Sequence, residues 1–409
     1  MKFLIIEQDL RISGTSQGII SRSFLAKLRT AYPDSIIDVH YLKQSSSEDQ
    51  LGLLPVNSIQ EYVLDLKIPF FTKWFNTIYW RLFHVSLASN HVYQVYRDCI
   101  AKIDYHQYNH IFIRSAGLNC ETILGAKDLP VLKKAIITFN EPYPLFWCTG
   151  SLNPLTNLEL FKVKEMFKVI SQAKTCMATA LLAQDLEYVY GSRKKFYPMP
   201  HQYDSSVFDL TDVSQLVKKK KKILISYHGA LQFGRNIEIV LDTYLELVET
   251  NAIYKENTEF VIRVKGADFK KLEAKYAANP NVTVFFISNF SNSCNEQMQE
   301  ADINIILENG PLHCNILVGK APFLASIPKP ILSISPERSE MRNIIQDAQY
   351  IASCTDKAEI KQKLENLMIN RMNSQEAVYP FGDYFSDANF KRMLDKILLE
   401  SDSDRLDKI

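Results

Sequence analysis

The chain has 409 residues, of which 46% are hydrophobic and 23% charged, so its composition is that of a folded globular protein and its length suits two domains. Its 47 basic and 46 acidic residues give a formal net charge of +1. This balance argues against a dedicated nucleic-acid-binding protein, whose surface is normally strongly basic.

Neither cysteine spacing nor hydropathy indicates an exported or membrane-spanning protein. None of the cysteines forms a Cys-x-x-Cys pair or has metal-ligand spacing, and we expect free thiols in a reducing cytoplasm. The opening "MKFLIIEQDL" turns polar after a short apolar run, which predicts a first strand rather than a signal peptide. No run of about eighteen uncharged apolar residues suggests a transmembrane helix.

Strand and helix patterns alternate along the first half of the chain. "KFLII" predicts a strand, a glycine-bearing polar loop follows, and "IISRSFLAKLRTAYP" has helical spacing. The next expected strands are "SIIDVHYL", "HIFIRSAG" and "KKAIITFNEPYP", and "KTCMATALLAQDLEYVYG" predicts a strand followed by a helix. Such alternation is typical of a mostly parallel sheet covered on both faces.

The same alternation restarts at Lys222. The predicted strands are "KILISYHG", "EFVIRVKG", "VTVFFIS", "ADINIILE" and "KPILSIS", with a helix near "FKKLEAKYAANP". The polar stretch "DLTDVSQLVKKKKK" marks the boundary between two α/β units. We expect domains at 1–206 and 207–378.

The segment 223–249 predicts a strand, a turn and then a helix. Gly229 and Gly234 allow a sharp turn, and the planar guanidinium of Arg235 could hold two phosphate oxygens near a helix N-terminus. The alternative is an ordinary strand-to-helix connection with a surface arginine. In the first loop, Gly14 and Gly18 likewise suit close approach of the backbone to a ligand.

The segment 67–88, "KIPFFTKWFNTIYWRLFHVSLA", is rich in aromatic residues with interspersed cations. This composition fits a helix lying in a membrane interface, and it equally fits a core helix covering the first sheet. Both interpretations remain open at the level of sequence. No Asp-x-Asp pair follows a strand, so we expect no metal cofactor.

Four stretches carry a resemblance to the retaining, nucleotide-sugar-dependent glycosyltransferases of family 4. They are "SGTSQGIISRSFLAKLRTAYP", "FYPMPHQYDSSVF", "YHGALQFGRNIEIVLD" and "GKAPFLASIPKPILSIS". The resemblance implies an α/β GT-B architecture, with two Rossmann-like domains facing a central cleft. It also implies a terminal helical segment, 379–409, that crosses back to the N-terminal domain.

The resemblance assigns roles to individual residues. Arg235 and Lys320 match the cations that contact the donor diphosphate, and Asn140 and Glu141 replace a motif near the transferred sugar. Further donor contacts are expected from the residues Gly14, Gly18, Gly229, Glu308 and His201, although His201 could instead hold a turn.

Two positions depart from the family pattern. Ala230 stands where an arginine is common, and Phe323 where a second glutamate usually contacts the nucleotide. The expected function is nevertheless metal-independent transfer of a sugar, with retention, from a nucleotide sugar to a glycan or lipid-linked acceptor. The protein would be cytoplasmic, with membrane contact on the inner face through 67–88 as one option. The departures motivate an alternative, a noncatalytic partner or scaffold of another glycosyltransferase, and a sugar-nucleotide epimerase is a third.

Overall fold

The computed structural model describes residues 1–12, 16–44, 49–148, 150–191 and 194–403. The chain forms two compact units. One comprises Met1–Val207 together with Ser386–Ile409, and the other comprises Phe208–Phe385. The first unit is therefore built from two separate parts of the sequence.

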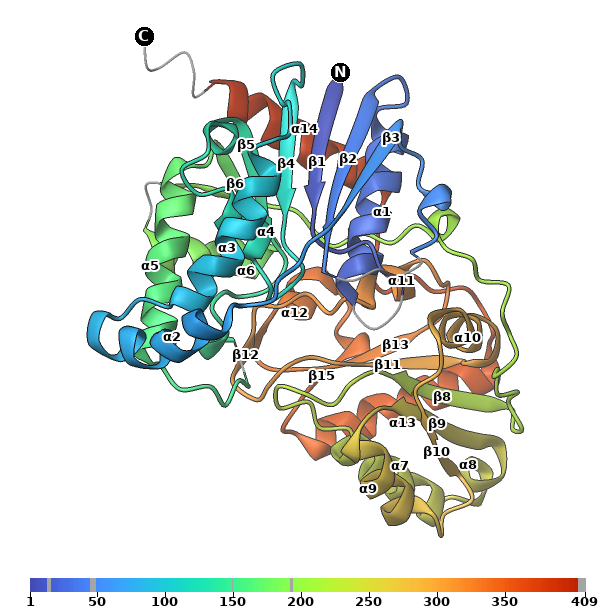
Figure 1. Cartoon of the computed structure of the whole chain (residues 1–409). Coiled ribbons are helices and arrows are strands. Elements are labelled where there is room, and N and C mark those ends of the chain that lie inside the picture. The colour runs from blue at the N-terminus through green and yellow to red at the C-terminus, as the bar shows by residue number, and fades with distance from the viewer. Residues whose placement is uncertain (13–15, 45–48, 149, 192–193, 404–409) are drawn as a thin grey trace. The chain divides into compact units, whose positions relative to one another are not determined.

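The first unit contains a seven-stranded sheet in the order β3-β2-β1-β4-β5-β6-β7, and every strand pair is parallel (Figure 1). The central strands are almost fully buried because both faces are covered, which explains their unbroken apolar sequences. The strands are β1 (Lys2–Glu7), β2 (Ile36–Lys43), β3 (Ser58–Val63), β4 (His110–Arg114), β5 (Ala135–Phe139), β6 (Thr175–Ala178) and β7 (Phe196–Pro198).

The helices of this unit cover the sheet, and the strand order reverses between β1 and β4. In doubly wound sheets, ligands bind at the carboxyl ends of the strands beside such a reversal. The helices are α1 (Ser16–Ala31), α2 (Phe70–Phe83), α3 (Leu87–Ile100), α4 (Glu121–Gly125), α5 (Asn157–Gln172), α6 (Ala180–Tyr190) and α14 (Asp387–Ser403).

The second unit contains a six-stranded parallel sheet in the order β10-β9-β8-β11-β13-β15, which reverses between β8 and β11. Its strands are β8 (Ile223–His228), β9 (Thr258–Val264), β10 (Val282–Phe286), β11 (Ile303–Leu307), β13 (Ile331–Ser335) and β15 (Ile351–Ser353), and two-residue strands β12 (His313–Cys314) and β14 (Arg338–Ser339) pair separately. Its helices are α7 (Glu238–Thr250), α8 (Ala252–Asn257), α9 (Ala267–Tyr276), α10 (Phe290–Asn295), α11 (Ala321–Ala325), α12 (Glu340–Ile344) and α13 (Lys357–Asn373).

The helix α14 packs on α1 within the first unit (Figure 1). The ring of Phe390 meets Phe24 edge-on at 5.8 Å between centroids. Asp395 accepts a hydrogen bond of 2.5 Å from the Tyr32 hydroxyl group. An apolar contact and a polar contact thus join the C-terminal helix to the first helix.

The buried guanidinium of Arg22 ties several backbone segments of the first unit together. It donates to the carbonyl oxygens of Leu10, Asp49, Gln50 and Val207 at 2.5–3.2 Å. Burial lowers the pKa of Arg22 to about 10, yet the group remains charged at neutral pH. The loop after β1 and the end of the N-terminal part of the first unit are therefore fixed to the same residue of α1.

The lysine run before β8 is anchored to the second unit. Lys218 pairs with Glu300 at 3.1 Å, Lys219 pairs with Asp302 at 3.2 Å, and the Lys222 ammonium donates to the Met372 carbonyl at 2.8 Å. Within the described residues, no helix is long and apolar enough to cross a membrane.

The packing of α14 yields a stability prediction. Phe390 is 3% exposed, so Phe390→Ala should reduce the free energy of unfolding of the first unit by about 3–5 kcal/mol, because it leaves a cavity against Phe24. Urea unfolding, with hydrogen exchange to assign the loss to this unit, measures the effect. Leu399→Ala is the matched control, since Leu399 lies on the same helix and is 71% exposed. Equal effects of the two substitutions would contradict the packing described.

Candidate functional site

In the second unit, the loop after β8 is shaped by two glycines at the strand-order reversal. A Cβ atom at Gly229 would lie 3.0 Å from the Lys320 Nζ and from the Tyr227 hydroxyl group. Gly234 has φ +79°, and a Cβ atom there would lie 2.2 Å from the carbonyl oxygen of Gly310. Gly234 therefore requires glycine, because of its left-handed backbone and its close approach to another backbone segment, whereas Gly229 is tightly packed against two side-chain ends.

The structure brings Lys320 and Arg235 together beside Tyr227. The Lys320 ammonium lies 4.2 Å from the centre of the Tyr227 ring and donates to the His228 carbonyl. The Arg235 Nε donates to the Asn309 side-chain oxygen at 3.0 Å. Within the described part of the chain, neither cation forms an ion pair with a carboxylate.

Lys320 is held in a partly protonated state. Burial, with a further contribution from the nearby positive charge of Arg235, lowers the pKa of Lys320 from 10.5 to about 7. Both causes disfavour the ammonium form. A bound anion would offset the repulsion from Arg235 and so favour the ammonium form again. The pair is thus a cationic site whose charge rises when a negative ligand enters.

A buried network holds the strand end on which Lys320 rests. The His228 Nδ1 lies 2.7 Å from the Ser293 hydroxyl, and its Nε2 lies 3.1 Å from Glu296. Glu296 in turn pairs with Arg263 at 2.7 Å. Burial lowers the pKa of His228, so the imidazole is neutral and acts as a fixed support.

Glu308 lies at the end of β11 and contacts the protein backbone. Its Oε1 accepts a hydrogen bond of 3.2 Å from the Met341 amide. Burial raises the pKa of Glu308 to about 7, although the nearby hydroxyl groups of Ser335 and Ser339 and this amide oppose the rise. Its Oε2 is buried and has no hydrogen-bond partner among the described residues.

The two departures from the family pattern are visible in the second unit. Phe323 is buried within α11, so the position of the usual second glutamate belongs to the core. Ala230 contributes its backbone carbonyl, which accepts hydrogen bonds from the Tyr227 hydroxyl at 3.2 Å and from Arg235 at 3.4 Å. The cationic site therefore consists of Arg235 and Lys320.

In the first unit, Gly18 lies in the first turn of α1 against the loop after β1. A Cβ atom at Gly18 would lie 1.9 Å from the Arg11 carbonyl oxygen, so no larger residue fits there. Gly14 lies outside the described residues. Arg11 itself makes a two-pronged contact with Asp9, at 2.8 and 2.9 Å, near the carboxyl end of β1.

Asn140 and Glu141 follow β5 directly. Asn140 is buried, and its Nδ2 donor has no partner within the described residues. Thr179 directly follows the adjacent strand β6 and is also buried. Its hydroxyl group has no hydrogen-bond partner within the described residues. Glu141 is partly exposed and lies next to Gly117, whose φ is +66°.

His201 is buried in the loop after β7, 3% exposed. It belongs to the first unit, and the cationic cluster belongs to the second.

Sequence reasoning missed Tyr227, Asn309 and Thr179. Asn309 and Thr179 each follow a predicted strand, so the rule that ligands lie at carboxyl strand ends could have identified them. Tyr227 lies inside an apolar strand, and its contact with Lys320 has no sequence signal. Within the described ranges, no group of three or more His, Cys, Asp or Glu residues could hold a metal ion.

Comparisons with solved structures give full-length matches at low sequence identity. The apo lipopolysaccharide outer core galactosyltransferase WaaB aligns with a TM-score of 0.58 at 12% identity, covering 98% of this chain and 99% of that one. The fold is GT-B. Two Rossmann-like α/β domains therefore confirm the predicted fold class.

Other neighbours share this fold and differ in activity. The N-terminal domain of Candida albicans trehalose-6-phosphate phosphatase has a TM-score of 0.62 at 12% identity, covering 98% of this chain and 97% of that one. UDP-GlcNAc 2-epimerase from Neisseria meningitidis, solved with UDP-GlcNAc, has a TM-score of 0.56 at 13% identity, covering 98% and 100%. No family model and no curated protein matches the sequence.

The nearby positive charge of Arg235 predicts how the pKa of Lys320 changes when Arg235 is replaced. Arg235→Gln should raise the pKa of Lys320 above its value of about 7, because removing the neighbouring positive charge favours the ammonium form. NMR titration of the lysine side chains measures this. Lys329, whose lowered pKa is caused by burial among other groups, is the internal control and should not shift.

The same lowered pKa has a consequence for stability. Between pH 7 and 10.5 the unfolded chain binds a proton at Lys320 that the folded chain has released. Stability in this window should therefore rise with pH more steeply in the wild type than in Lys320→Met. Parallel curves for the two proteins would contradict the assignment.

Proposed function

We propose that the protein is a glycosyltransferase that transfers a sugar from a nucleoside diphosphate sugar to a glycan or lipid-linked acceptor, with retention of anomeric configuration. The observation that carries this proposal is the pairing of Lys320 with Arg235 at the carboxyl edge of the second sheet, with no carboxylate ion pair within the described residues. Two adjacent cations repel each other, so a dianionic ligand such as a diphosphate relieves an existing cost.

The chemistry follows from the charge that develops during the reaction. When the glycosidic bond breaks, negative charge grows on the leaving diphosphate, and fixed cations stabilise this transition state more than the ground state. The leaving phosphate would accept the proton of the acceptor hydroxyl, so no side-chain base is required. We assign the diphosphate contact to Arg235 and Lys320, without a metal ion.

The remaining donor and acceptor contacts are assigned by position at strand ends. The free amide donor of Asn140 suits a sugar hydroxyl, and the partly exposed Glu141 suits the sugar or acceptor. Gly18 and Gly229 are assigned to the loops that face the donor, where the carbonyl of Arg11 packs beside Gly18 and the side chains of Lys320 and Tyr227 pack beside Gly229. Glu308 and His201 are assigned to the support of the donor loops. Membership of family 4 is part of this proposal.

One second function has specific support, because structural neighbours include UDP-GlcNAc 2-epimerases. An epimerase converts the nucleotide sugar in the absence of an acceptor, whereas a transferase requires one. Incubation with UDP-GlcNAc alone separates the two. Phe323 and Ala230 replace a glutamate and an arginine of the family pattern, which leaves a noncatalytic partner of another glycosyltransferase as an alternative. Such a partner would show no thermal shift in screening against UDP, GDP, ADP and CMP sugars.

The diphosphate site can be tested by substitution. Arg235→Ala and Lys320→Ala should each weaken donor binding or turnover by about 1.5–3 kcal/mol, because each removes a hydrogen bond to a charged group. Calorimetry with the donor found in the screen and initial-rate kinetics measure the loss. Lys357→Ala, which alters an exposed ion pair on α13, is the control. Unchanged affinity and rate in both variants would exclude this site.

We further propose that α2 lies on an anionic membrane surface, which would bring the enzyme to a lipid-linked acceptor. No residue of α2 is buried, so the core-helix interpretation of this segment is wrong. Thr72, Asn76 and Trp80, at four-residue spacing, are the partly covered positions, and Asn76 accepts a 3.1 Å hydrogen bond from the Ala88 amide. The apolar face is the exposed one, and it consists of Phe71, Trp74, Phe75, Ile78 and Leu82.

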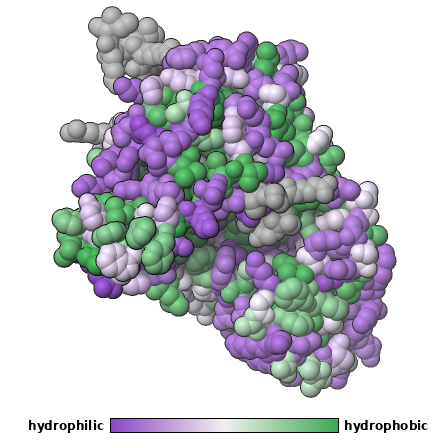
Figure 2. Space-filling model, viewed as in Figure 1, coloured by the Kyte–Doolittle hydropathy of each residue, from purple (hydrophilic) through white to green (hydrophobic). Residues whose placement is uncertain are grey.

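This arrangement inverts the usual one, in which a surface helix turns its apolar side to the core. A patch of apolar residues is visible at the position of α2 in Figure 2. Lys67, Lys73 and Arg81 are exposed in and beside this helix. Aromatic residues flanked by cations suit the headgroup region of an anionic leaflet.

The membrane contact predicts a selective loss of vesicle binding. Phe71→Asp combined with Trp74→Asp should abolish co-sedimentation with anionic vesicles and leave the melting temperature unchanged, because these side chains are 73% and 57% exposed. Thr77→Asp, an exposed position between Lys73 and Arg81, is the control for an added negative charge. Sedimentation that survives the double substitution would place the membrane contact elsewhere.

A further inference from the structure

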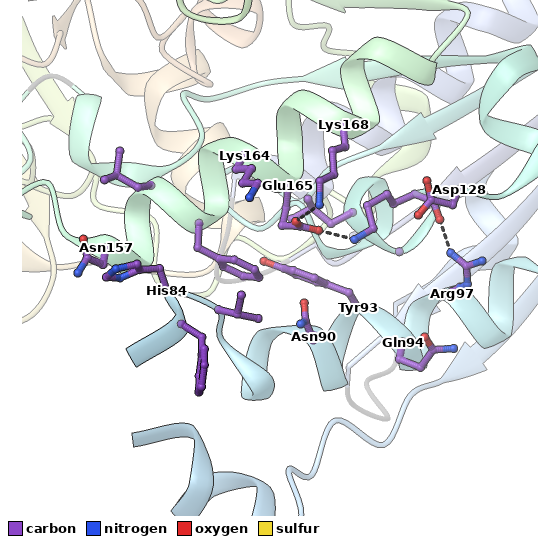
Figure 3. Close-up of a pocket in the computed structure, with 17 residues that line it drawn as sticks. His84, Asn90, Tyr93, Gln94, Arg97, Asp128, Asn157, Lys164, Glu165 and Lys168 are labelled. Carbon is purple, nitrogen blue, oxygen red and sulfur yellow. Dashed lines mark hydrogen bonds and ion pairs between the residues drawn. The ribbon is translucent and has the colours of Figure 1, made fainter. Parts of the chain in front are cut away.

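A cavity of about 1100 Å³ opens in the first unit beside the exposed helix, lined by residues of α2, α3, α4 and α5 and by adjoining loops (Figure 3). Its floor includes Phe161 and Leu124, which are buried, and Tyr93 points into it from α3. These helices lie on the outside of the first sheet. None of the strand-end residues assigned above lines this cavity.

The polar part of this cavity has an excess of positive charge. Four lysine or arginine residues line it against two carboxylates, Asp128 and Glu165. Glu165 is already shared, since Lys168 donates to it at 2.7 Å and Lys127 contacts its other oxygen. Burial opposes ionisation of Glu165, but the hydrogen bonds from these two lysines lower its pKa.

Lys164 is the cation that the cavity leaves available. It is exposed, extends from α5 on the same side as Lys168, and forms none of the ion pairs found among the described residues (Figure 3). Asn90, Asn157 and the ring of His84 add hydrogen-bonding groups around the same space. Ammonium groups with neutral donors nearby are suited to a phosphate monoester or diester.

The rim of the cavity is continuous with the apolar face of α2. Phe83, at the end of α2, lines the cavity and is 59% exposed, and Leu160 of α5 lines it and is 52% exposed. A ligand in this space would therefore have its polar end near Lys164 and an apolar part beside exposed hydrophobic side chains. This is the division of a phospholipid into headgroup and acyl chains.

We infer that the cavity between α2, α3 and α5 binds the phosphate-bearing headgroup of an anionic lipid while the apolar face of α2 lies among the adjacent lipids. The inference rests on the membrane contact proposed for α2 and adds to it a defined headgroup site. A second copy of the chain is a poorer occupant, since two such faces would bring Lys73 and Arg81 of each copy near like charges.

The test compares vesicles of phosphatidylcholine with vesicles that also contain phosphatidic acid. Lys164→Gln with Lys168→Gln should lower affinity for the phosphatidic acid vesicles by about tenfold or more, since each basic residue near an anionic surface adds to the attraction. Affinity for pure phosphatidylcholine should not change. Lys102→Gln with Lys133→Gln removes the same charge at exposed positions of this unit outside the cavity and is the matched control.

A second measurement separates a lipid headgroup from free phosphate. Water-soluble dihexanoyl phosphatidic acid should shift the NMR signals of the Lys164 and Lys168 side chains, and inorganic phosphate at the same concentration should shift them far less. Equal shifts would overturn the lipid assignment. An equal loss of vesicle affinity in the Lys164/Lys168 variant and in the Lys102/Lys133 control would show a general effect of charge. That result would overturn the headgroup site.

The result also distinguishes this inference from the proposed membrane contact. The wild type could bind vesicles through Phe71 and Trp74 while the Lys164→Gln, Lys168→Gln variant keeps the preference for phosphatidic acid. In that case the headgroup site is wrong and the membrane contact of α2 stands. If the wild type binds neither kind of vesicle, or self-associates through α2 in their absence, the membrane contact fails and the headgroup site fails with it.

Discussion

The proposed chemistry depends on one electrostatic constraint, the close approach of Lys320 and Arg235 beside Tyr227. Burial is the main cause of the lowered pKa of Lys320, and the nearby positive charge of Arg235 lowers it further, so both disfavour the ammonium form in the folded chain. The surrounding structure holds the pair in place through packing rather than charge. Tyr227 contributes an aromatic surface, Asn309 orients the guanidinium, and the His228 carbonyl fixes the ammonium. A diphosphate at the proposed site would thus meet cations that are already held in position.

The parallel strands were readable from sequence because both of their faces are buried. "KFLII", "KILISYHG" and "ADINIILE" each contain a short apolar run, and they correspond to β1, β8 and β11. The edge strand β3 was not predicted, since its mostly exposed residues show no such run. Gly18 was expected to let the backbone approach a ligand, and in the fold its open side is filled by the carbonyl group of Arg11.

Other features lie beyond single-sequence reasoning because they depend on which surfaces meet. The composition of α2 is the same for a core helix and an interfacial one, and the fold shows which face is covered through the partial burial of Thr72, Asn76 and Trp80. Glu308 has the sequence position of a ligand contact, yet in the fold it accepts a backbone amide. The cavity at Lys164 joins helices whose residues are far apart in sequence.

The divided first unit has a consequence for how the protein is made. Phe24 lies on α1, near the start of the chain, and its partner Phe390 lies on α14, which follows the whole second unit in sequence. A ribosome must therefore translate the second unit before the first can close its hydrophobic core. During this interval the face of α1 that packs on Phe390 is exposed to solvent and to other nascent chains. It stays exposed in a chain whose synthesis stops before α14. The order of synthesis makes the second unit the first one free to fold completely.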